Sequence, residues 1–234
     1  MAAPIVETHS LGKTFGLTPV LREVELRVLP GRGALVVGGN GAGKSTLLAI
    51  LAGLLRPSEG YALVFGENTG SLGGRYRKRI GMLTHQSFLY PNLSGRENLE
   101  FYAELYGVSD PAGAAANWLA EVGLADFADE RVRAYSRGME QRLAAARALI
   151  AEPGLLLLDE PFMSLDSDGA ALVGRLIAAA LNRGASVVAT AHGVLELAGA
   201  ELEVYQLSRG KLAPFIGAPH EEVRRGRLRS LLGR

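Results

Sequence analysis

Cysteine is absent from the sequence, and histidine occurs only four times. Without cysteine the chain can form neither a disulfide framework nor a cysteine-ligated metal site, which is compatible with a reducing cytosol. The low histidine count also disfavours a histidine-rich metal site. The function of the protein must therefore rest on other residue types.

Long hydrophobic runs are missing as well. No apolar run approaches the roughly 18 residues that a bilayer-spanning helix needs, and the longest ones, such as GLLLLD from Gly154, have the length of a strand. The first residues, MAAPIVETHSLGKTF, lack the basic and apolar regions of a signal peptide. We therefore expect any membrane contact to be made through a partner.

The net charge is close to zero. Twenty-five lysine and arginine residues against 24 aspartate and glutamate residues give +1, which predicts no nucleic-acid partner. A local excess occurs in HEEVRRGRLRSLLGR, from His220, a candidate basic helix for which a solvated surface and a contact with anionic lipid both stay open. The 234 residues, 48% of them hydrophobic, suit an α/β protein whose strands are buried on both faces.

Residues 33–55, GALVVGGNGAGKSTLLAILAGLL, predict a buried strand, a glycine-rich loop and a helix. Residues 38–45 fit G-x-x-x-x-G-K-[ST], the pattern of a P-loop, in the required context. Lys44 would supply a charge to the β- and γ-phosphates, and Ser45 a hydroxyl to Mg²⁺. The motif alone does not separate kinase, GTPase and ATPase. The residues predicted to bind nucleotide here are Gly38, Gly39, Asn40, Gly41, Ala42, Gly43, Lys44, Ser45 and Thr46.

Residues 154–166, GLLLLDEPFMSLD, predict a fully buried parallel strand with an acid at its carboxyl end. Ligands of open α/β sheets bind at that end, so Asp159 is placed to hold the Mg²⁺ shell. Glu160 would polarise a water for in-line attack on the γ-phosphate, a role that a small-molecule kinase does not need. The alternative for Glu160 is a helix-capping or salt-bridging acid.

A second anion site is indicated by YSRGMEQRLAAARAL, from Tyr135, where a Ser-x-Gly turn opens an alanine-rich helix. Ser136 offers a hydroxyl and Gly138 a bare backbone beside the positive end of the helix dipole. No phosphate-binding lysine lies within this stretch, so these residues alone do not say which anion it serves.

Taken in order, these motifs resemble the ATP-binding subunits of ABC transporters, over nearly the whole chain. The resemblance implies a P-loop NTPase (RecA-like) α/β core with an antiparallel β subdomain and an inserted helical lobe. It also implies ATP and Mg²⁺ as ligands. The elements that carry it are Phe15, residues 38–45, Gln86, residues 136–138, Asp159, Glu160, residues 164–166 and His192.

In this family two nucleotide domains pack head to tail, and the Ser-x-Gly loop of one binds the γ-phosphate of ATP held by the other. The resemblance thus implies that Ser136 and Gly138 bind ATP held by a second copy of the chain. It also implies that Asp166 lies at the interface between the two copies. The chain departs from the usual LSGGQ pattern at Arg137 and Met139, which puts the strength of that contact in question.

Three further roles are implied by the resemblance. Gln86 would reach the Mg²⁺ and the attacking water, His192 would hydrogen-bond the γ-phosphate, and Phe15 would stack on adenine. A glutamine in a loop is uninformative by itself, and a capping or core role is the alternative for His192.

The chain is predicted to be one ABC ATP-binding domain, residues 1–234. Residues 1–87 and 151–234 form the core with its β subdomain, in which residues 4–30 and a strand from Tyr61 are antiparallel. Residues 88–150 form the helical lobe, where Ser94 and Glu97 have capping-box spacing. The glycine-rich basic stretch 68–79 is predicted to be a solvated loop.

The resemblance implies an ATP-driven conformational motor, peripheral at the cytoplasmic face of the cell membrane, which powers export through a separate permease. Within the family, YPNL-x-x-REN, SRGM and DEPF followed by LD-x-x-G are similar to the haem exporter subunit of cytochrome c biogenesis. Two alternatives stay open, a soluble ABC ATPase for cofactor assembly and a subunit of a drug, lipid or polysaccharide exporter.

Overall fold

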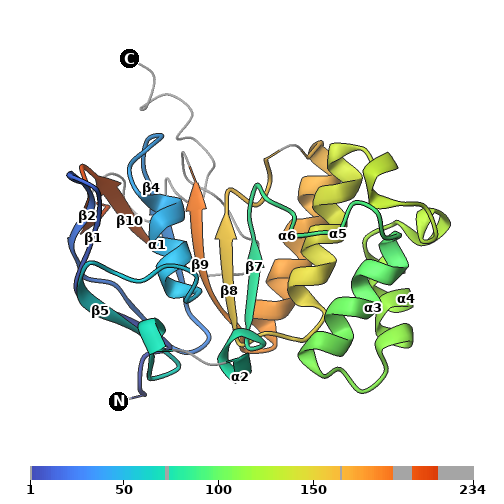
Figure 1. The fold of residues 1–234 in the computed structure, drawn as a ribbon, viewed down its shortest axis with the longest axis horizontal. Coiled ribbons are helices and arrows are strands. Elements are labelled where there is room, and N and C mark those ends of the chain that lie inside the picture. The colour runs from blue at the N-terminus through green and yellow to red at the C-terminus, as the bar shows by residue number, and fades with distance from the viewer. Residues whose placement is uncertain (1, 72–73, 164, 192–201, 216–234) are drawn as a thin grey trace.

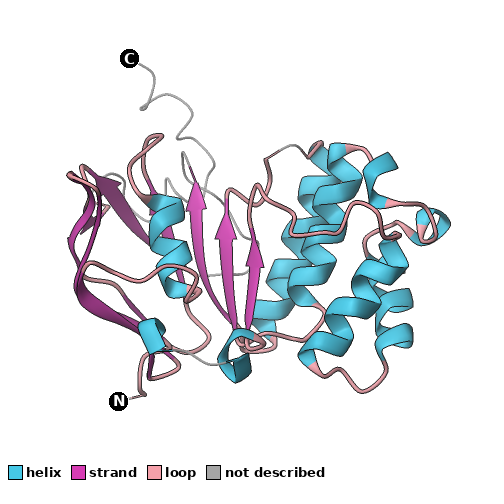
Figure 2. Cartoon of the chain, viewed as in Figure 1, coloured by secondary structure: helices cyan, strands magenta, loops and turns pink. Residues whose placement is uncertain are grey.

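The computed structural model describes residues 2–71, 74–163, 165–191 and 202–215. A parallel sheet lies at its centre, between an antiparallel sheet and a group of helices (Figure 1). Figure 2 shows most strands on one side of the molecule and most helices on the other. The predicted α/β fold, with an antiparallel β subdomain and an inserted helical lobe, is confirmed.

The central sheet has the strand order β11-β10-β4-β9-β8-β7. Its described strands pair in parallel except for β11, which runs antiparallel to β10. The strands are β4 (Gly33–Val37), β7 (Ile80–Leu83), β8 (Leu155–Asp159), β9 (Ser186–Ala191), β10 (Leu202–Ser208) and β11 (Lys211–Pro214). The helices that cover its faces are α1 (Lys44–Leu51), α5 (Arg137–Leu149) and α6 (Ser167–Asn182).

Strands β4, β8 and β9 of this sheet are buried on both faces, and the leucine run of β8 shows why the sequence lacks polar alternation there. Leu155 and Leu157 face the cluster around α1, whereas Leu156 and Leu158 face the cluster formed by α5 and α6. Successive strand residues point to opposite faces. An uninterrupted apolar run is therefore what a parallel strand covered on both sides requires.

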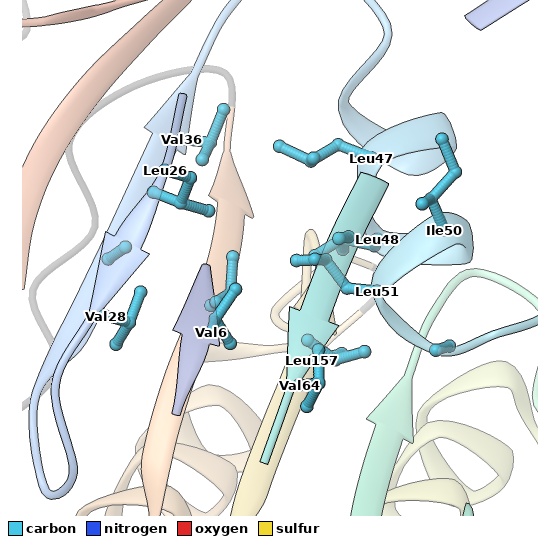
Figure 3. Close-up of a cluster of buried hydrophobic side chains, with 14 of the residues drawn as sticks. Val6, Leu26, Val28, Val36, Leu47, Leu48, Ile50, Leu51, Val64 and Leu157 are labelled. Carbon is cyan, nitrogen blue, oxygen red and sulfur yellow. The ribbon is translucent and has the colours of Figure 1, made fainter. Parts of the chain in front are cut away.

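The antiparallel sheet packs on the other side of α1. Its strands are β1 (Val6–Phe15), β2 (Thr18–Val24), β3 (Arg27–Val28), β5 (Glu59–Val64) and β6 (Glu67–Asn68). Val6, Val28 and Val64 of this sheet share a buried cluster with Leu47 and Leu51 of α1 (Figure 3). Burying each of these side chains contributes about 1.5–3 kcal/mol, so α1 is fixed between two sheets. The antiparallel strands predicted in residues 4–30 and from Tyr61 are confirmed.

Of the prediction for residues 68–79, the loop was wrong, but the solvated basic face is confirmed for Arg77, Lys78 and Arg79, which are exposed. The segment contains a 3₁₀ turn, η1 (Thr69–Ser71), and a short helix, α2 (Gly74–Arg77). Tyr76 is buried, and its hydroxyl donates to the Leu51 carbonyl oxygen at 3.2 Å. Burial raises the pKa of the Tyr76 hydroxyl far above its ordinary value. One aromatic side chain thus anchors a segment whose composition otherwise resembles a loop.

The lobe between β7 and β8 contains α3 (Gly95–Tyr106), α4 (Pro111–Glu121), two 3₁₀ turns, η2 (Ala125–Phe127) and η3 (Val132–Ala134), and α5. The predicted capping box is confirmed. The Glu97 N–H donates to Ser94 Oγ at 3.1 Å, and the Ser94 N–H donates to Glu97 Oε2 at 2.7 Å. No helix among the described residues is both long and apolar enough to cross a bilayer.

Helix α5 is buried on two sides. Ala144, Ala145 and Ala148 pack in the cluster with β8 and α6, whereas Leu143 and Ala146 pack in the cluster of the lobe. The small alanine side chains let the helix lie close to the sheet. A single helix therefore belongs to the core and to the lobe at once.

Candidate functional site

The predicted nucleotide loop, residues 38–45, connects the carboxyl end of β4 to α1. Gly43 occupies the position before α1 with φ of 105°, and a methyl group there would lie 2.9 Å from Leu21 Cδ2 and 3.0 Å from the Val20 oxygen. A side chain is excluded there by conformation and by space. Because glycine cannot cap the helix with a side chain, the first amides of α1 stay available to an anion. These amides include those of Ser45 and Thr46.

Lys44 is buried at the centre of this loop, with 6% of its side chain exposed. Its Nζ donates to the carbonyl oxygens of Gly38 at 2.7 Å and of Gly39 at 3.3 Å, and lies 3.5 Å from Glu160 Oε1. Two residues predicted from separate motifs, a phosphate-binding lysine and a water-polarising glutamate, therefore meet. A negative phosphate group brought here would interact with the same ammonium group.

Asp159, the predicted metal ligand, ends β8 in a buried position. Its Oδ1 accepts a hydrogen bond of 2.5 Å from Thr190 Oγ1, and Thr190 is fully buried on the neighbouring strand β9. The hydroxyl fixes one carboxylate oxygen and leaves the other oxygen for a ligand. Thr190 was missed by sequence reasoning, although its place opposite Asp159 follows once β8 and β9 are aligned from their ends.

Glu160 leaves the strand in a left-handed conformation, with φ of 51°. This region is uncommon for residues other than glycine. Its N–H donates to the Thr190 oxygen at 3.2 Å, and its carbonyl oxygen accepts from the Met163 N–H at 3.0 Å. This backbone turn directs the Glu160 side chain toward Lys44. No local sequence pattern predicted the turn.

A hollow of about 610 Å³ lies beside the nucleotide loop. It is lined by residues 39–42 of the nucleotide loop, by Thr18, Val20 and Arg22 of β2, and by residues 207–210. Phe15, the predicted adenine contact, pairs with Thr18 across the β1–β2 turn and is 49% exposed. The hollow is large enough for the sugar and base of a nucleotide bound at the loop.

A second hollow, of about 580 Å³, lies at the beginnings of α5 and α6 and is lined by Ser136, Gly138 and Asp166 among others. Ser136 Oγ accepts from the Met139 N–H at 3.2 Å, and Asp166 Oδ1 accepts from the Gly169 N–H at 2.8 Å. Ser136 and Asp166 thus cap their own helices. Within the described part of the chain, no hydrogen bond or ion pair joins them to residues 38–45.

The third hollow, of about 250 Å³, joins the remaining segments of the site. Its lining residues are His85, Ser87, Arg137, Glu140, Gln141, Glu160 and Met163. Gln86, between the first two, is exposed, and its N–H donates to Thr84 Oγ1 at 3.1 Å while its carbonyl oxygen accepts from the same hydroxyl at 2.8 Å. The predicted His192, and Ser164 of the SLD motif, lie outside the described residues.

The predicted metal ligands supply only oxygen, from the Ser45 hydroxyl, the Gln86 amide and the Asp159 carboxylate. In the described residues no three histidine, aspartate or glutamate side chains gather into a metal-binding group. This donor set fits Mg²⁺, which takes one or two protein ligands and completes its shell with phosphate oxygens and water.

Comparison with known proteins places the same segments in a known sequence family. The family profile described as "ABC transporter" matches residues 21–163. A relative from Xanthomonas oryzae pv. oryzae, called cytochrome c biogenesis ATP-binding export protein CcmA, is 41% identical over 82% of this chain and 88% of its own length. A second CcmA protein, from Cupriavidus metallidurans, is 35% identical over 87% of this chain and 97% of its own.

Another relative is named for import. The molybdenum import ATP-binding protein ModC of Mycobacterium tuberculosis is 36% identical over 82% of this chain and 55% of its own length. Among solved structures, a dimeric post-hydrolysis state of the ATP-binding cassette MJ0796, bound to ADP and Pi, has a TM-score of 0.81 and 27% identity. The match covers 91% of this chain and all of the other.

Proposed function

Because the chain belongs to the family of ABC transporter ATP-binding domains, we propose that it is the ATP-hydrolysing subunit of an exporter whose membrane-spanning subunit is a separate chain. The observation that carries this proposal is the meeting of Lys44 Nζ with Glu160 Oε1 at 3.5 Å, beside the Asp159–Thr190 hydrogen bond. The residues that we propose as phosphate-binding cation, base and metal ligand lie together at the carboxyl edge of the sheet, where ligands of such sheets bind.

In the mechanism that we propose, the amides of the nucleotide loop hold the phosphates and Lys44 shifts from the loop carbonyls to the β- and γ-phosphates. The Glu160 carboxylate would then accept a proton from the attacking water. Ser45 and Asp159 would hold Mg²⁺, which when bound neutralises charge that develops on the phosphate oxygens. Thr190 keeps Asp159 oriented throughout.

We also propose that two copies complete each other's sites. Ser136, Gly138 and Asp166 share a hollow of their own, away from the loop that would hold nucleotide. In a head-to-tail pair, the anion site at the beginning of α5 would meet the γ-phosphate on the other copy, and the two sites would be identical by symmetry. The dimeric state of the similar cassette MJ0796 supports this arrangement.

The membrane subunit would dock on an aromatic groove between the core and the lobe. Leu54 and Phe88, both exposed, line it together with Tyr102, Tyr106 and Arg147. Tyr90 and Phe101 are also exposed and pack against Tyr102. An exposed apolar patch of this kind marks an interaction site.

Arg147 holds the aromatic wall of this groove together from inside the protein. The Arg147 guanidinium is almost fully buried, donates to the Met82 oxygen and lies 5.5 Å from the ring centres of Phe88 and Tyr102. Burial lowers its pKa, and among the described residues its Nε has no hydrogen-bond partner. We infer that an apolar segment of the membrane subunit fills the groove.

We propose haem export for cytochrome c biogenesis as the transport process, on the strength of the two CcmA relatives. ModC, an import protein, is 36% identical, which supports the view that the membrane subunit sets the cargo. The location that follows is the cytoplasmic face of the cell membrane, with membrane contact only through that subunit.

The test of hydrolysis is phosphate release by the purified protein and by its Glu160→Gln variant. Removal of a general base costs about 10²- to 10⁴-fold in rate, so we expect a loss of at least a hundredfold. Glu121→Gln, which changes an exposed glutamate of α4, should leave the rate unchanged. Undiminished turnover by the Glu160→Gln variant would remove Glu160 from its assigned role.

The test of partner and cargo is capture of tagged Glu160→Gln protein with ATP from native membranes. A co-purified membrane protein with a haem absorption band is expected. A permease without haem would move the cargo to a drug, lipid or polysaccharide, and no membrane protein would favour cofactor assembly.

A matched pair of variants tests the groove. Phe101 and Phe127 are exposed to similar extents, 39% and 40%, but only Phe101 packs against Tyr90 and Tyr102 at the groove. We expect Phe101→Glu to abolish co-purification of the membrane subunit and Phe127→Glu to retain it. Equal capture by both variants would place the interface elsewhere.

A further inference from the structure

The first turn of α5 is tied to both segments that flank the predicted reaction centre. Ser87 Oγ donates to Glu140 Oε1 at 2.6 Å, although the two residues are 53 positions apart. The next residue, Gln141, donates through Nε2 to the Pro161 oxygen at 3.4 Å. One helical turn thus holds the segment of Gln86 through one side chain and the segment that follows Glu160 through another.

Glu140 is not needed to cap its own helix. The cap is made by Ser136, whose Oγ accepts from the Met139 N–H, and the Glu140 N–H bonds the Ser136 carbonyl oxygen at 2.9 Å. The Glu140 carboxylate is therefore free of the helix end and reaches across to Ser87. An acid in this first turn is favoured by the helix dipole, but the dipole does not determine that direction.

The segment that Ser87 belongs to has a defined shape. Thr84 Oγ1 bonds both backbone groups of Gln86, and Ser87 Oγ accepts from the Leu89 N–H at 3.4 Å. A segment braced in this way moves as a unit. A displacement of Ser87 therefore displaces Gln86 as well. Glu140 is the residue of α5 through which a movement of the helix reaches Ser87.

We propose that Glu140 is a positioning residue. Through its hydrogen bond to Ser87, it couples the anion site at the beginning of α5 to the Gln86 segment. The inference rests on the proposed function and adds a regulation to it. Binding of a γ-phosphate at Ser136 and Gly138 shifts the first turn of α5, and the Glu140–Ser87 bond carries that shift to Gln86. The two segments are then set for hydrolysis together.

An effect of charge must be separated from this tether, because Glu140 lines the same hollow as Arg137 and Glu160. Glu140→Gln removes the charge but retains an oxygen that accepts from Ser87. Glu140→Ala removes both, and Ser87→Ala removes the donor while leaving the charge. These three variants distinguish a hydrogen bond from an electrostatic influence on Glu160.

The kinetic test measures kcat and KM for ATP with the full chain. A hydrogen bond to an ionised group in a partly buried place is worth about tenfold, so Glu140→Ala and Ser87→Ala should each lower kcat about five- to tenfold. Neither residue touches nucleotide, so KM should change by less than about twofold. The double variant should be no slower than either single variant, and Glu140→Gln should stay within about twofold of the wild type. A Glu140→Gln variant as slow as Glu140→Ala, or additive losses in the double variant, would contradict the tether.

Hydrogen exchange of the nucleotide-free protein tests the tether without hydrolysis. The amides of residues 84–89 should exchange faster in Glu140→Ala and Ser87→Ala than in the wild type, and Glu140→Gln should resemble the wild type. Unchanged exchange in all variants would overturn the proposal. A wild type that hydrolyses no ATP would instead overturn the proposed function, and the exchange result would still stand.

Discussion

At the scale of single residues, some features of the site can be predicted from local sequence motifs, whereas others arise only when the chain folds. The nucleotide loop, Asp159 and Glu160 could be predicted because each lies in a short segment of distinctive composition. Thr190 and Glu140 could not, because each acts on a residue that is remote in the sequence. Thr190 lies 31 positions from Asp159, and only the pairing of β8 with β9 brings the two residues together.

Thr190 therefore offers a sharp prediction. Thr190→Val keeps the volume of the side chain but removes the donor to Asp159 Oδ1, so the carboxylate loses its orientation. A hydrogen bond to a charged group contributes about 1.5–3 kcal/mol, so we expect the Mg²⁺ concentration for half-maximal ATPase activity to rise by at least about tenfold. Titration of activity with Mg²⁺ measures this. Thr190→Ser, which keeps the hydroxyl, should match the wild type, and a Thr190→Val variant that also matches would show that Asp159 needs no orientation.

At the scale of elements, patterns of capping and apolar spacing predicted most helices and strands. The capping box at Ser94 and the buried strand ending at Asp159 are in place because their signals are local. The failure at residues 68–79 has a different origin, since a buried Tyr76 outweighs a loop-like composition there. The two buried sides of α5 were equally hidden, because alanine is compatible with the surface and the interior.

The space around two glycines, Gly81 and Gly174, shows how closely α5 and α6 pack against their neighbours. A Cβ at Gly81, on β7, would lie against the Ala148 carbonyl oxygen of α5 and 2.8 Å from Leu156 Cδ2, whereas at Gly174, on α6, its nearest neighbours are Phe162 atoms at 3.8 and 3.9 Å. We expect Gly81→Ala to lower the free energy of unfolding by about 2–3 kcal/mol through overpacking. Gly174→Ala should raise it by up to about 1 kcal/mol through helix propensity. Urea unfolding measures the free energy of unfolding of both variants. Equal values for the two would mean that α5 can shift to make room for the methyl group at position 81.

At the scale of the whole molecule, the anion site of α5 and the nucleotide loop face different hollows of one chain. This separation is the structural reason to expect that the chain does not act alone. The sequence predicted a dimer only through resemblance to a family, because an interface between copies leaves no periodic signal along one chain.

Dimer formation should depend on ATP. With ATP, the Glu160→Gln variant should double its mass in solution from the 24.8 kDa of one chain, and its melting temperature should rise with protein concentration. Ser136→Arg in the same background fills the anion site, so that protein should remain monomeric. Light scattering measures the masses, and an ATP-dependent dimer of the Ser136→Arg protein would exclude this site from the interface.

The order of the central sheet has a consequence for how the protein is made. Strand β4, which leads into the nucleotide loop, lies between β9 and β10, and both of these are synthesised near the end of the chain. A nascent chain that already contains residues 33–55 therefore has no neighbours with which to complete that part of the sheet. The ribosome must release residues up to about 208 before the loop acquires its support, so an unfinished chain cannot hold nucleotide in a formed site.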